Sequence, residues 1–395
     1  MLITAARILT GNLGEVIDDG AVLMSGETIV AAGPRTHIED QAQSNEPRLD
    51  FPGATVMAGL IDAHTHLCFD AGREPVETLL ASSDDDLADA MRIRAERFLA
   101  AGVTTVRDLG DRGGLALRLA REIDRGTTAG PRILSAGAPV TPVGGHCHFL
   151  GGEVNGPGEI RALVQRNASA GAKVIKVMET GGALTKGGKP SWENQFTLDD
   201  LKVLVQEARQ VGLPVAAHAH GAEGIADAVE AGVDTLEHCT WMTPGRDIGL
   251  REDVLAAIVA KNIAVCPTIT ADWRQLPLFF GEELAQKMFD AVQRMAAVGV
   301  RLITGTDAGV QRAQPGGLAA SLTFYQHLGI PAERILQMAT TQTAQALGLG
   351  DETGKIAAGY RADVIVLDGN PLENLDALRA VKAVFAKGQR YQPQA

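Results

Sequence analysis

The pattern of apolar positions divides the chain into two ends and a longer middle. At both ends the apolar runs are short, and turn pairs such as Asp19-Gly20 and Ser25-Gly26 separate them. This spacing predicts a small β-sandwich rather than strand–helix units. Strands are expected at 2–4, 21–24, 28–32 and 54–57, and again at 362–367 and 380–385. Because neither end alone can bury much apolar surface, we expect both termini, 1–57 and 348–395, to form this sandwich together.

The middle of the chain, residues 58–347, alternates between strand and helix patterns. Several strand segments are near-continuous apolar runs, which is typical of parallel strands buried on both faces. Eight strands are expected at 55–66, 102–109, 131–140, 172–178, 213–220, 233–239, 262–268 and 300–307. Helices are expected at 79–100, 115–125, 159–170, 198–211, 222–231, 251–261, 283–298 and 317–347. Eight such units in succession predict an α/β fold, a (β/α)₈ TIM barrel that forms the catalytic domain.

Composition narrows the class of protein. Of the 395 residues, 45% are hydrophobic and 21% charged, as in an ordinary globular enzyme, and the formal net charge is -12. An acidic chain disfavours nucleic acid and anionic membrane as partners, because either needs a basic face. We see neither a transmembrane stretch nor a signal peptide and expect a cytoplasmic protein. The four scattered cysteines, which we expect to be reduced packing residues, are Cys68, Cys147, Cys239 and Cys266.

Polar residues that can bind metal gather at the predicted strand ends. His64 and His66 alternate along the first strand, so they face the same way and can hold one metal ion, although such a pair alone fits a plain strand end equally well. The further members are Lys176 on the fourth strand, His218 and His220 on the fifth, His238 on the sixth and Asp307 on the eighth. Seven of the nine histidines lie at these ends or in the loop after the third strand. Packing roles would not concentrate histidines at one end of a barrel, so the pattern favours a metal site.

Lys176 is the most informative of these residues. It shares strand parity with Val174 and Met178, so its ammonium should face the barrel interior. Burial lowers the pKa of a lysine, and the neutral amine can react with CO₂ to give a carbamate whose two oxygens bridge two metals. The alternative is a lysine that reaches solvent or pairs with a carboxylate. Lys173, of opposite parity, is expected to point away.

Catalytic roles are expected for Asp307 and for two histidines. Asp307 is placed to bind a metal and to accept a proton from water, although an acid at a strand end also suits a helix N-cap. His146, in a glycine-rich loop, is expected to donate a hydrogen bond to the oxyanion, whereas neighbouring His148 fits a structural role better. His220 is expected to contact substrate or orient a ligand. The loop 185–192 fits a lid and a plain surface loop equally well.

Several motifs resemble those of the amidohydrolase superfamily, and within it the imidazolonepropionase-like and prolidase-like metal-dependent hydrolases. The matching segments, spread over nearly the whole chain, are 26–33, 59–66, 174–182, 215–221, 235–238, 305–307 and 354–363. The resemblance implies a distorted barrel with a β-sandwich from both termini, and a binuclear site for two divalent ions, usually Zn²⁺. It implies that His64, His66 and Asp307 hold one ion, that His218 and His238 hold the other, and that carbamylated Lys176 bridges them.

The lysine argues against the deaminase and imidazolonepropionase branches, which lack it. Relatives with it resemble dipeptidases of the Xaa-Pro or Xaa-Arg type and N-acyl-amino-acid hydrolases, which often form homo-oligomers. Glu179 departs from the pattern, where a small residue is expected, and predicts a more polar or more acidic pocket wall beside the bridge.

Our hypothesis is amide hydrolysis of a small-molecule or dipeptide substrate by a metal-bridging hydroxide, with Asp307 moving the proton. The alternatives are hydrolysis of cyclic amides, lactones or carbamates, and a non-catalytic metal-binding scaffold.

Overall fold

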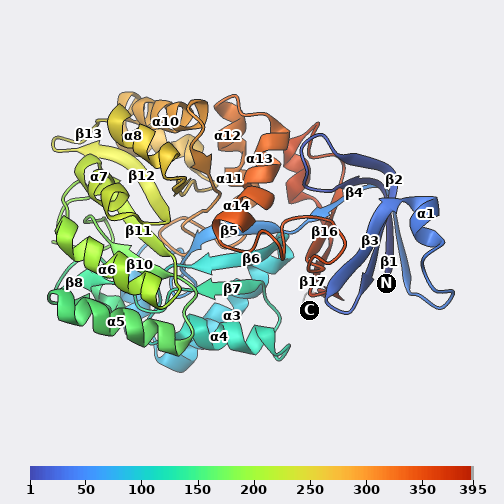
Figure 1. Ribbon diagram of the computed structural model, residues 1–395, viewed down its shortest axis with the longest axis horizontal. Helices are drawn as coiled ribbons and strands as arrows, with labels where there is room; N and C mark the ends of the chain where they lie inside the picture. Colours follow the sequence, from blue (N-terminus) through green and yellow to red (C-terminus); the bar gives the residue numbers. More distant parts are fainter. Residues whose placement is uncertain (393–395) are drawn as a thin grey trace.

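One end of the molecule is a seven-stranded sheet that contains both ends of the chain (Figure 1). The computed structural model describes residues 1–392, and the sheet has the strand order β18-β17-β16-β4-β1-β2-β3. Its strands are β1 (Leu2–Leu9), β2 (Val16–Ser25), β3 (Thr28–Pro34), β4 (Arg48–Ala58), β16 (Val364–Asp368), β17 (Val381–Ala386) and β18 (Gln389–Arg390). A short helix, α1 (Arg35–Glu39), follows β3. The antiparallel pairing of β4 with β16 joins the two ends, as the sequence predicts.

Apolar residues from both ends of the chain form one buried cluster on this sheet. It includes Ile8, Val56, Val366 and Phe385, which come from four different strands. A β-sandwich needs two sheets, and within residues 1–392 the strands of the two termini form one hydrogen-bonded sheet. The predicted β-sandwich therefore stays a prediction.

The larger part of the molecule is an α/β body with parallel strands (Figure 1). One sheet holds β5 (Leu60–Thr65), β6 (Val103–Asp108) and β7 (Arg132–Ser135). The other holds β10 (Ile175–Met178), β11 (Val215–Gly221), β12 (Thr235–Thr243), β14 (Ala264–Cys266) and β15 (Arg301–Leu302), with β13 (Asp247–Ile248) antiparallel to β12. Two further short strands, β8 (Thr141–Pro142) and β9 (Glu153–Val154), pair with each other. Each of the eight predicted strand ranges therefore contains a strand, and the α/β class is confirmed.

These strands form two separate ladders rather than one closed ladder. Several backbone hydrogen bonds connect the two sheets at each gap. At one gap, the Val140 N–H donates to the Lys176 carbonyl over 2.7 Å. At the other, the Asp307 N–H donates to the His64 carbonyl over 2.8 Å. The strand ends that carry the candidate site residues are thus connected through the backbone.

Most helices match their predicted ranges within a few residues. They are α4 (Leu115–Asp124), α5 (Pro157–Ala170), α6 (Leu198–Gln210), α7 (Ala222–Ala231), α8 (Glu252–Ala260) and α10 (Glu282–Ala297). Helix α9 (Leu276–Phe280) and three 3₁₀ turns, His148–Leu150, Trp273–Gln275 and Leu375–Arg379, lie in stretches without a predicted helix. No helix in the described range 1–392 combines the length and apolar character needed to cross a bilayer.

Two predicted helices are interrupted. The range 79–100 contains the end of α2 (Pro75–Ala81) and then α3 (Asp84–Ala100), because the Ser83 hydroxyl accepts a hydrogen bond from the Asp86 N–H and starts a new helix. The range 317–347 contains α11 (Leu318–Ser321), α12 (Thr323–His327), α13 (Ala332–Met338) and α14 (Thr341–Ala346). Gly329, with a φ of +82°, and Pro331 separate α12 from α13.

A single residue, Gly59, separates the seven-stranded sheet from the first strand of the body. The predicted strand 55–66 is therefore divided between β4 and β5. A Cβ atom at Gly59 would lie 2.0 Å from the Thr104 hydroxyl oxygen, so only glycine fits here. The accessory sheet is in this way connected directly to the strand that carries His64.

Candidate metal centre

The predicted site residues lie around one cavity of about 700 Å³. Its lining includes His64, His66, His146, Lys176, His218, His220, His238 and Asp307. They come from the ends of β5, β10, β11 and β12, from the segment after β15 and from the loop after β7. The structure thus brings together every catalytic and metal-binding residue named from the sequence.

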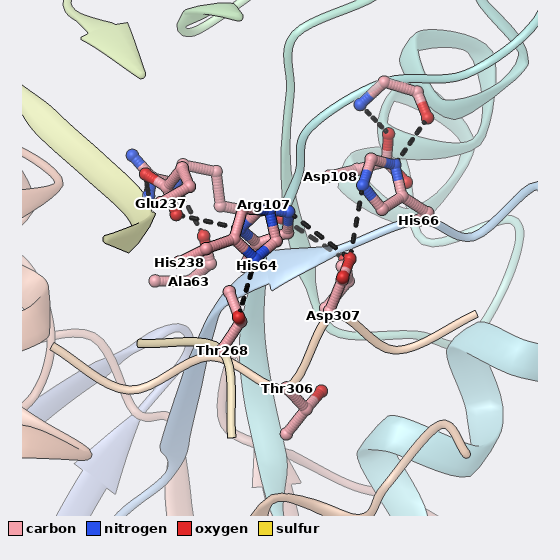
Figure 2. Close-up of polar contacts among 12 residues, drawn as sticks. Ala63, His64, His66, Arg107, Asp108, Glu237, His238, Thr268, Thr306 and Asp307 are labelled. Carbon is pink, nitrogen blue, oxygen red and sulfur yellow. Dashed lines mark hydrogen bonds and ion pairs between the residues drawn. The ribbon is translucent and has the colours of Figure 1, made fainter. Parts of the chain in front are cut away.

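The first group of metal-binding atoms consists of His64, His66 and Asp307. The Nε2 atoms of His64 and His66 lie 3.4 Å and 3.5 Å from Asp307 Oδ1 (Figure 2). The Nδ1 atom of His66 lies 3.0 Å from the Gly110 carbonyl oxygen, which can only accept a hydrogen bond. The proton of His66 is therefore on Nδ1, and the lone pair on Nε2 is free for a metal.

A buried carboxylate orients His64 in the same way. Glu237 Oε2 lies 2.8 Å from His64 Nδ1 (Figure 2). Its Oε1 accepts hydrogen bonds from Arg107 Nη2 at 2.7 Å and from Thr235 Oγ1 at 2.5 Å. Arg107 Nε donates in turn to the Ala63 carbonyl at 2.7 Å. Carboxylate partners of this kind fix the ring and raise the basicity of a metal-binding histidine. The sequence analysis assigned no role to Glu237 or Arg107. Each is a charged residue within an apolar strand, which could have indicated a buried ion pair.

The second group consists of His218, His220 and His238, one ring nitrogen of each lying within 4.8 Å of the others. Two ring nitrogens of this group have hydrogen-bond partners: His218 Nε2 lies 3.1 Å from the Gly181 carbonyl, and His238 Nδ1 lies 2.8 Å from Thr268 Oγ1. The resemblance placed only two of these histidines on a metal. In the structure, the ring of His220 stacks on that of His238 with the centroids 4.4 Å apart, so three imidazoles are within reach of one ion.

Two polar atoms at the cavity floor lack hydrogen-bond partners. Lys176 is fully buried, and neither its Nζ nor Asp307 Oδ1 has a hydrogen bond within the described chain. Burial lowers the pKa of Lys176 to about 8, whereas Lys173 is exposed, as their opposite parity predicts. A buried polar atom without a partner costs free energy, so this arrangement fits a site that is completed by a bound group.

The histidines are electrostatically suited to binding cations. Burial lowers the pKa of His66 and His220 to about 4 and that of His146 to about 3. Burial likewise lowers the pKa of His64, His218 and His238 well below 6.5. All six imidazoles are therefore neutral near pH 7, which is the form that binds a metal. A set of imidazole nitrogens and carboxylate oxygen suits Zn²⁺ and similar divalent ions.

Unusual backbone conformations accompany these side chains. The φ angles of His238, Thr268 and Asp307 are +68°, +54° and +57°. Left-handed backbone is unfavourable for such residues and persists only where neighbouring contacts impose it. For Asp307 the contact is Asp62, whose carboxylate accepts hydrogen bonds from the Thr306 N–H at 3.0 Å and hydroxyl at 2.6 Å. Asp62 thus fixes the backbone immediately before Asp307.

Comparison with known proteins places the chain in a family. Residues 55–391 match the amidohydrolase family. The chain belongs to this family. Metal-dependent hydrolysis of carbon–nitrogen bonds in small molecules is therefore the activity class of the protein.

Individual relatives cover nearly the whole amidohydrolase chain. It is 29% identical to an ochratoxinase of Aspergillus niger over 97% of this chain and 84% of that one. It is 25% identical to an imidazolonepropionase of Mesorhizobium japonicum, over 89% and 87% of the two chains. Among solved structures, a Xaa-Pro dipeptidase with bound methionine superposes with a TM-score of 0.87 at 29% identity, covering 99% of both chains.

Other residues singled out in the sequence have more peripheral places in this amidohydrolase. His148 lines the cavity, and the Thr185 hydroxyl of the candidate lid loop lies 3.3 Å from His146 Nδ1. Lys186 of the same loop pairs with Glu74, at 3.2 Å, and with Glu77 on α2. All four cysteines are buried and free, in agreement with their predicted packing role.

The prediction that Glu179 makes the pocket wall more polar or more acidic is wrong. Glu179 is fully buried but is not among the residues that line the cavity. Glu179 directly follows β10, and its Cγ lies against Gly224 of α7, 3.4 Å from where a Cβ of that residue would be. Burial raises the pKa of Glu179 to about 9, so its carboxyl is neutral near pH 7.

Proposed function

We propose that this amidohydrolase cleaves the amide bond of dipeptides, of the Xaa-Pro or Xaa-Arg type, or of N-acyl amino acids. The observation that carries the proposal is the pair of metal-binding groups at the floor of one cavity, accompanied by a buried lysine without a partner. The likeness to an ochratoxinase and to a Xaa-Pro dipeptidase supports an amide as the substrate.

In this proposal the site holds two divalent ions, most simply Zn²⁺. His64, His66 and Asp307 would hold one ion. His218 and His238 would hold the other, with His220 within reach of the same position. Bound there, the ions would polarise the substrate carbonyl and lower the pKa of water.

Lys176 is proposed to bridge the two groups as a carbamate. Lys176 lines the same cavity as both metal-binding groups, and its Nζ has no hydrogen-bond partner within the described chain. The neutral Nζ would attack the carbon of CO₂, forming one N–C bond and releasing one proton. A buried cation is thereby replaced by an anion with two oxygens, which suits a site for two cations.

The remaining chemistry is assigned to side chains of the chain itself. Asp307 accepts the proton of the attacking water and passes it to the nitrogen of the leaving amine. His146, oriented by the Thr185 hydroxyl, donates a hydrogen bond to the oxygen that becomes negative. His220 contacts the substrate or orients its neighbours in the second group.

The proposed architecture is a distorted (β/α)₈ barrel, residues 58–347, with an accessory domain from 1–57 and 348–395. The backbone hydrogen bonds that connect the two parallel sheets at both gaps support the barrel. The seven-stranded sheet from both termini supports the accessory domain.

The test of function is a screen of metal-loaded protein against dipeptides and N-acyl amino acids, with cyclic amides, lactones and carbamates as the comparison set. We expect the highest kcat/KM within the first two classes. Two bound ions without turnover of any amide, or a preference for lactones, would overturn the proposal. The carbamate is tested separately by ¹³C-bicarbonate labelling, where the wild type should show a carbamate resonance that the K176M variant lacks.

A further inference from the structure

The cavity above the candidate metal centre has an apolar outer wall. We define the apolar vestibule as the cavity-lining residues Leu80, Leu184, Ile269, Leu276, Phe280 and Met288. They come from α2, α9, α10 and two loops. The buried His64, His218 and Lys176 line the same cavity, so its inner part is polar and its exposed part, at Leu80 and Phe280, is apolar.

Two members of the vestibule are exposed in spite of their size. The exposed fraction is 58% for Leu80 and 42% for Phe280. Large apolar side chains that line a cavity and remain in contact with water mark a surface that binds an apolar group. Of the charged residues that line the cavity here, Lys186 is paired with Glu74 and Glu77, and Arg73 is exposed.

The size of the cavity also favours a large substrate. Its volume of about 700 Å³ lies in the upper half of the range of about 300–1,000 Å³ typical of small-molecule sites. A polar floor can hold the amide group, and the remaining volume faces apolar side chains.

We infer that this enzyme selects amides that carry a bulky apolar group, aromatic or aliphatic, on one side of the scissile bond. This inference rests on the proposed amide hydrolysis and names its substrate class. The apolar group occupies the vestibule against Leu80 and Phe280 while the amide lies at the floor. Binding removes both apolar surfaces from water, which supplies the preference.

Helix α9 offers a matched control. Phe279 precedes Phe280 directly and is similarly exposed, at 49%, but it does not line the cavity. Its ring instead lies 4.3 Å from the guanidinium carbon of Arg312. A serine at either position removes one exposed phenylalanine, yet only one of the two changes alters the vestibule.

The experiment compares wild type, F280S and F279S on matched substrates. One series is N-acetyl-proline, N-butanoyl-proline and N-octanoyl-proline, and the second pairs N-acetyl-alanine with N-acetyl-phenylalanine. In wild type we expect kcat/KM to rise with apolar size in at least one series. In F280S that gain, taken as the ratio of the largest to the smallest substrate of a series, should fall by about tenfold or more, chiefly through KM. F279S should behave as wild type.

Equal rates across both series in wild type, or equal effects of F280S and F279S, would overturn the inference. If the proposed amide hydrolysis itself is wrong, no substrate of either series is turned over, and this outcome differs from the two above. In that case, calorimetric binding of N-octanoyl-proline to the metal-loaded protein decides the inference. Binding that is weakened in F280S and unchanged in F279S supports the vestibule, and absence of binding to wild type overturns it.

Discussion

At the scale of single residues, the candidate site depends on departures from regular strand geometry. In a regular strand, neighbours such as Glu237 and His238 point to opposite faces. The left-handed backbone of His238 breaks this alternation, so Glu237 can reach His64 while His238 joins the histidines around the cavity. Each such conformation costs about 1–3 kcal/mol, which the surrounding contacts must offset.

This departure explains which residue roles were predictable. The alternation of side chains between the two faces of a strand was enough to predict that Lys176 is buried and Lys173 exposed. Parity could not predict the partnership of Glu237 with His64, because it depends on a φ angle that no sequence pattern marks. The stacking of His220 on His238 depends likewise on how two strands approach each other.

Asp307→Asn tests the proton transfer. Asparagine keeps the size and one oxygen of the side chain but cannot accept a proton from water. We expect kcat to fall by at least about 100-fold while both metal ions remain bound, measured as turnover and as metal content per chain. Full turnover in this variant would remove Asp307 from the mechanism.

Glu237→Gln tests the orientation of His64. The amide oxygen can serve either His64 or Arg107 but not both, so metal affinity should fall by about 10–100-fold in a chelator competition assay. Glu230→Gln is the control, because Glu230 is exposed and pairs only with Lys202 across a surface. We also expect a loss of stability of up to about 3–5 kcal/mol, since Arg107 is left without its carboxylate. A variant that loses stability but binds metal normally would restrict Glu237 to a structural role.

At the scale of elements, two predicted long helices were wrong because a helix cap or a glycine–proline segment interrupts them. Apolar periodicity continues through Ser83 and through Pro331, so it predicted single long helices. The Ser83 cap and the Gly329–Pro331 segment interrupt the backbone hydrogen bonds of the helices. The spacing of apolar residues does not report such interruptions. The strands were more predictable, because their apolar runs are bounded by glycine.

Gly305→Ala tests how closely β15 must approach the first strand of the body. A Cβ at Gly305 would lie 2.5 Å from Cys266 Sγ and 2.8 Å from His64 Cβ. Relieving this overlap moves the segment that carries Asp307 away from His64. We expect a loss of about 1–3 kcal/mol in urea unfolding and weaker metal binding.

The control for this variant is Gly158→Ala in α5, where nothing lies within 4 Å of the added Cβ. This change should leave metal binding unaltered and stabilise the protein by about 0.4–1 kcal/mol. Equal effects of the two alanines would show that the approach of β15 is not critical.

At the scale of the whole molecule, the order of the strands along the chain could be predicted from the sequence. Whether their hydrogen bonds join into one closed ladder could not. The eight strand ranges and the joining of both termini follow from apolar patterning. The ladder is interrupted between β7 and β10 and between β15 and β5. Strands β14 and β15 span only three and two residues. Their continuations, at Thr268 and Asp307, leave the extended conformation to present side chains to the cavity.

Removal of metal should affect the whole molecule, since the donor atoms come from both parallel sheets. Because an ion that binds only the folded state stabilises it, saturation at 1,000 times Kd adds about 4 kcal/mol. We therefore expect a chelator to abolish turnover and lower the melting temperature, and Zn²⁺ to restore both. Turnover that survives in protein shown to be metal-free would contradict the metal centre.

The pairing of β4 with β16 has a consequence for biosynthesis. Residues 59–363 must be translated after β4 and before its partner strand, which takes about 15–60 s at 5–20 residues per second. Throughout that interval the nascent chain presents β4 as an unpaired edge, a template for contacts with other chains. Yield during expression should therefore depend on chaperone supply and on temperature more than the stability of the finished enzyme suggests.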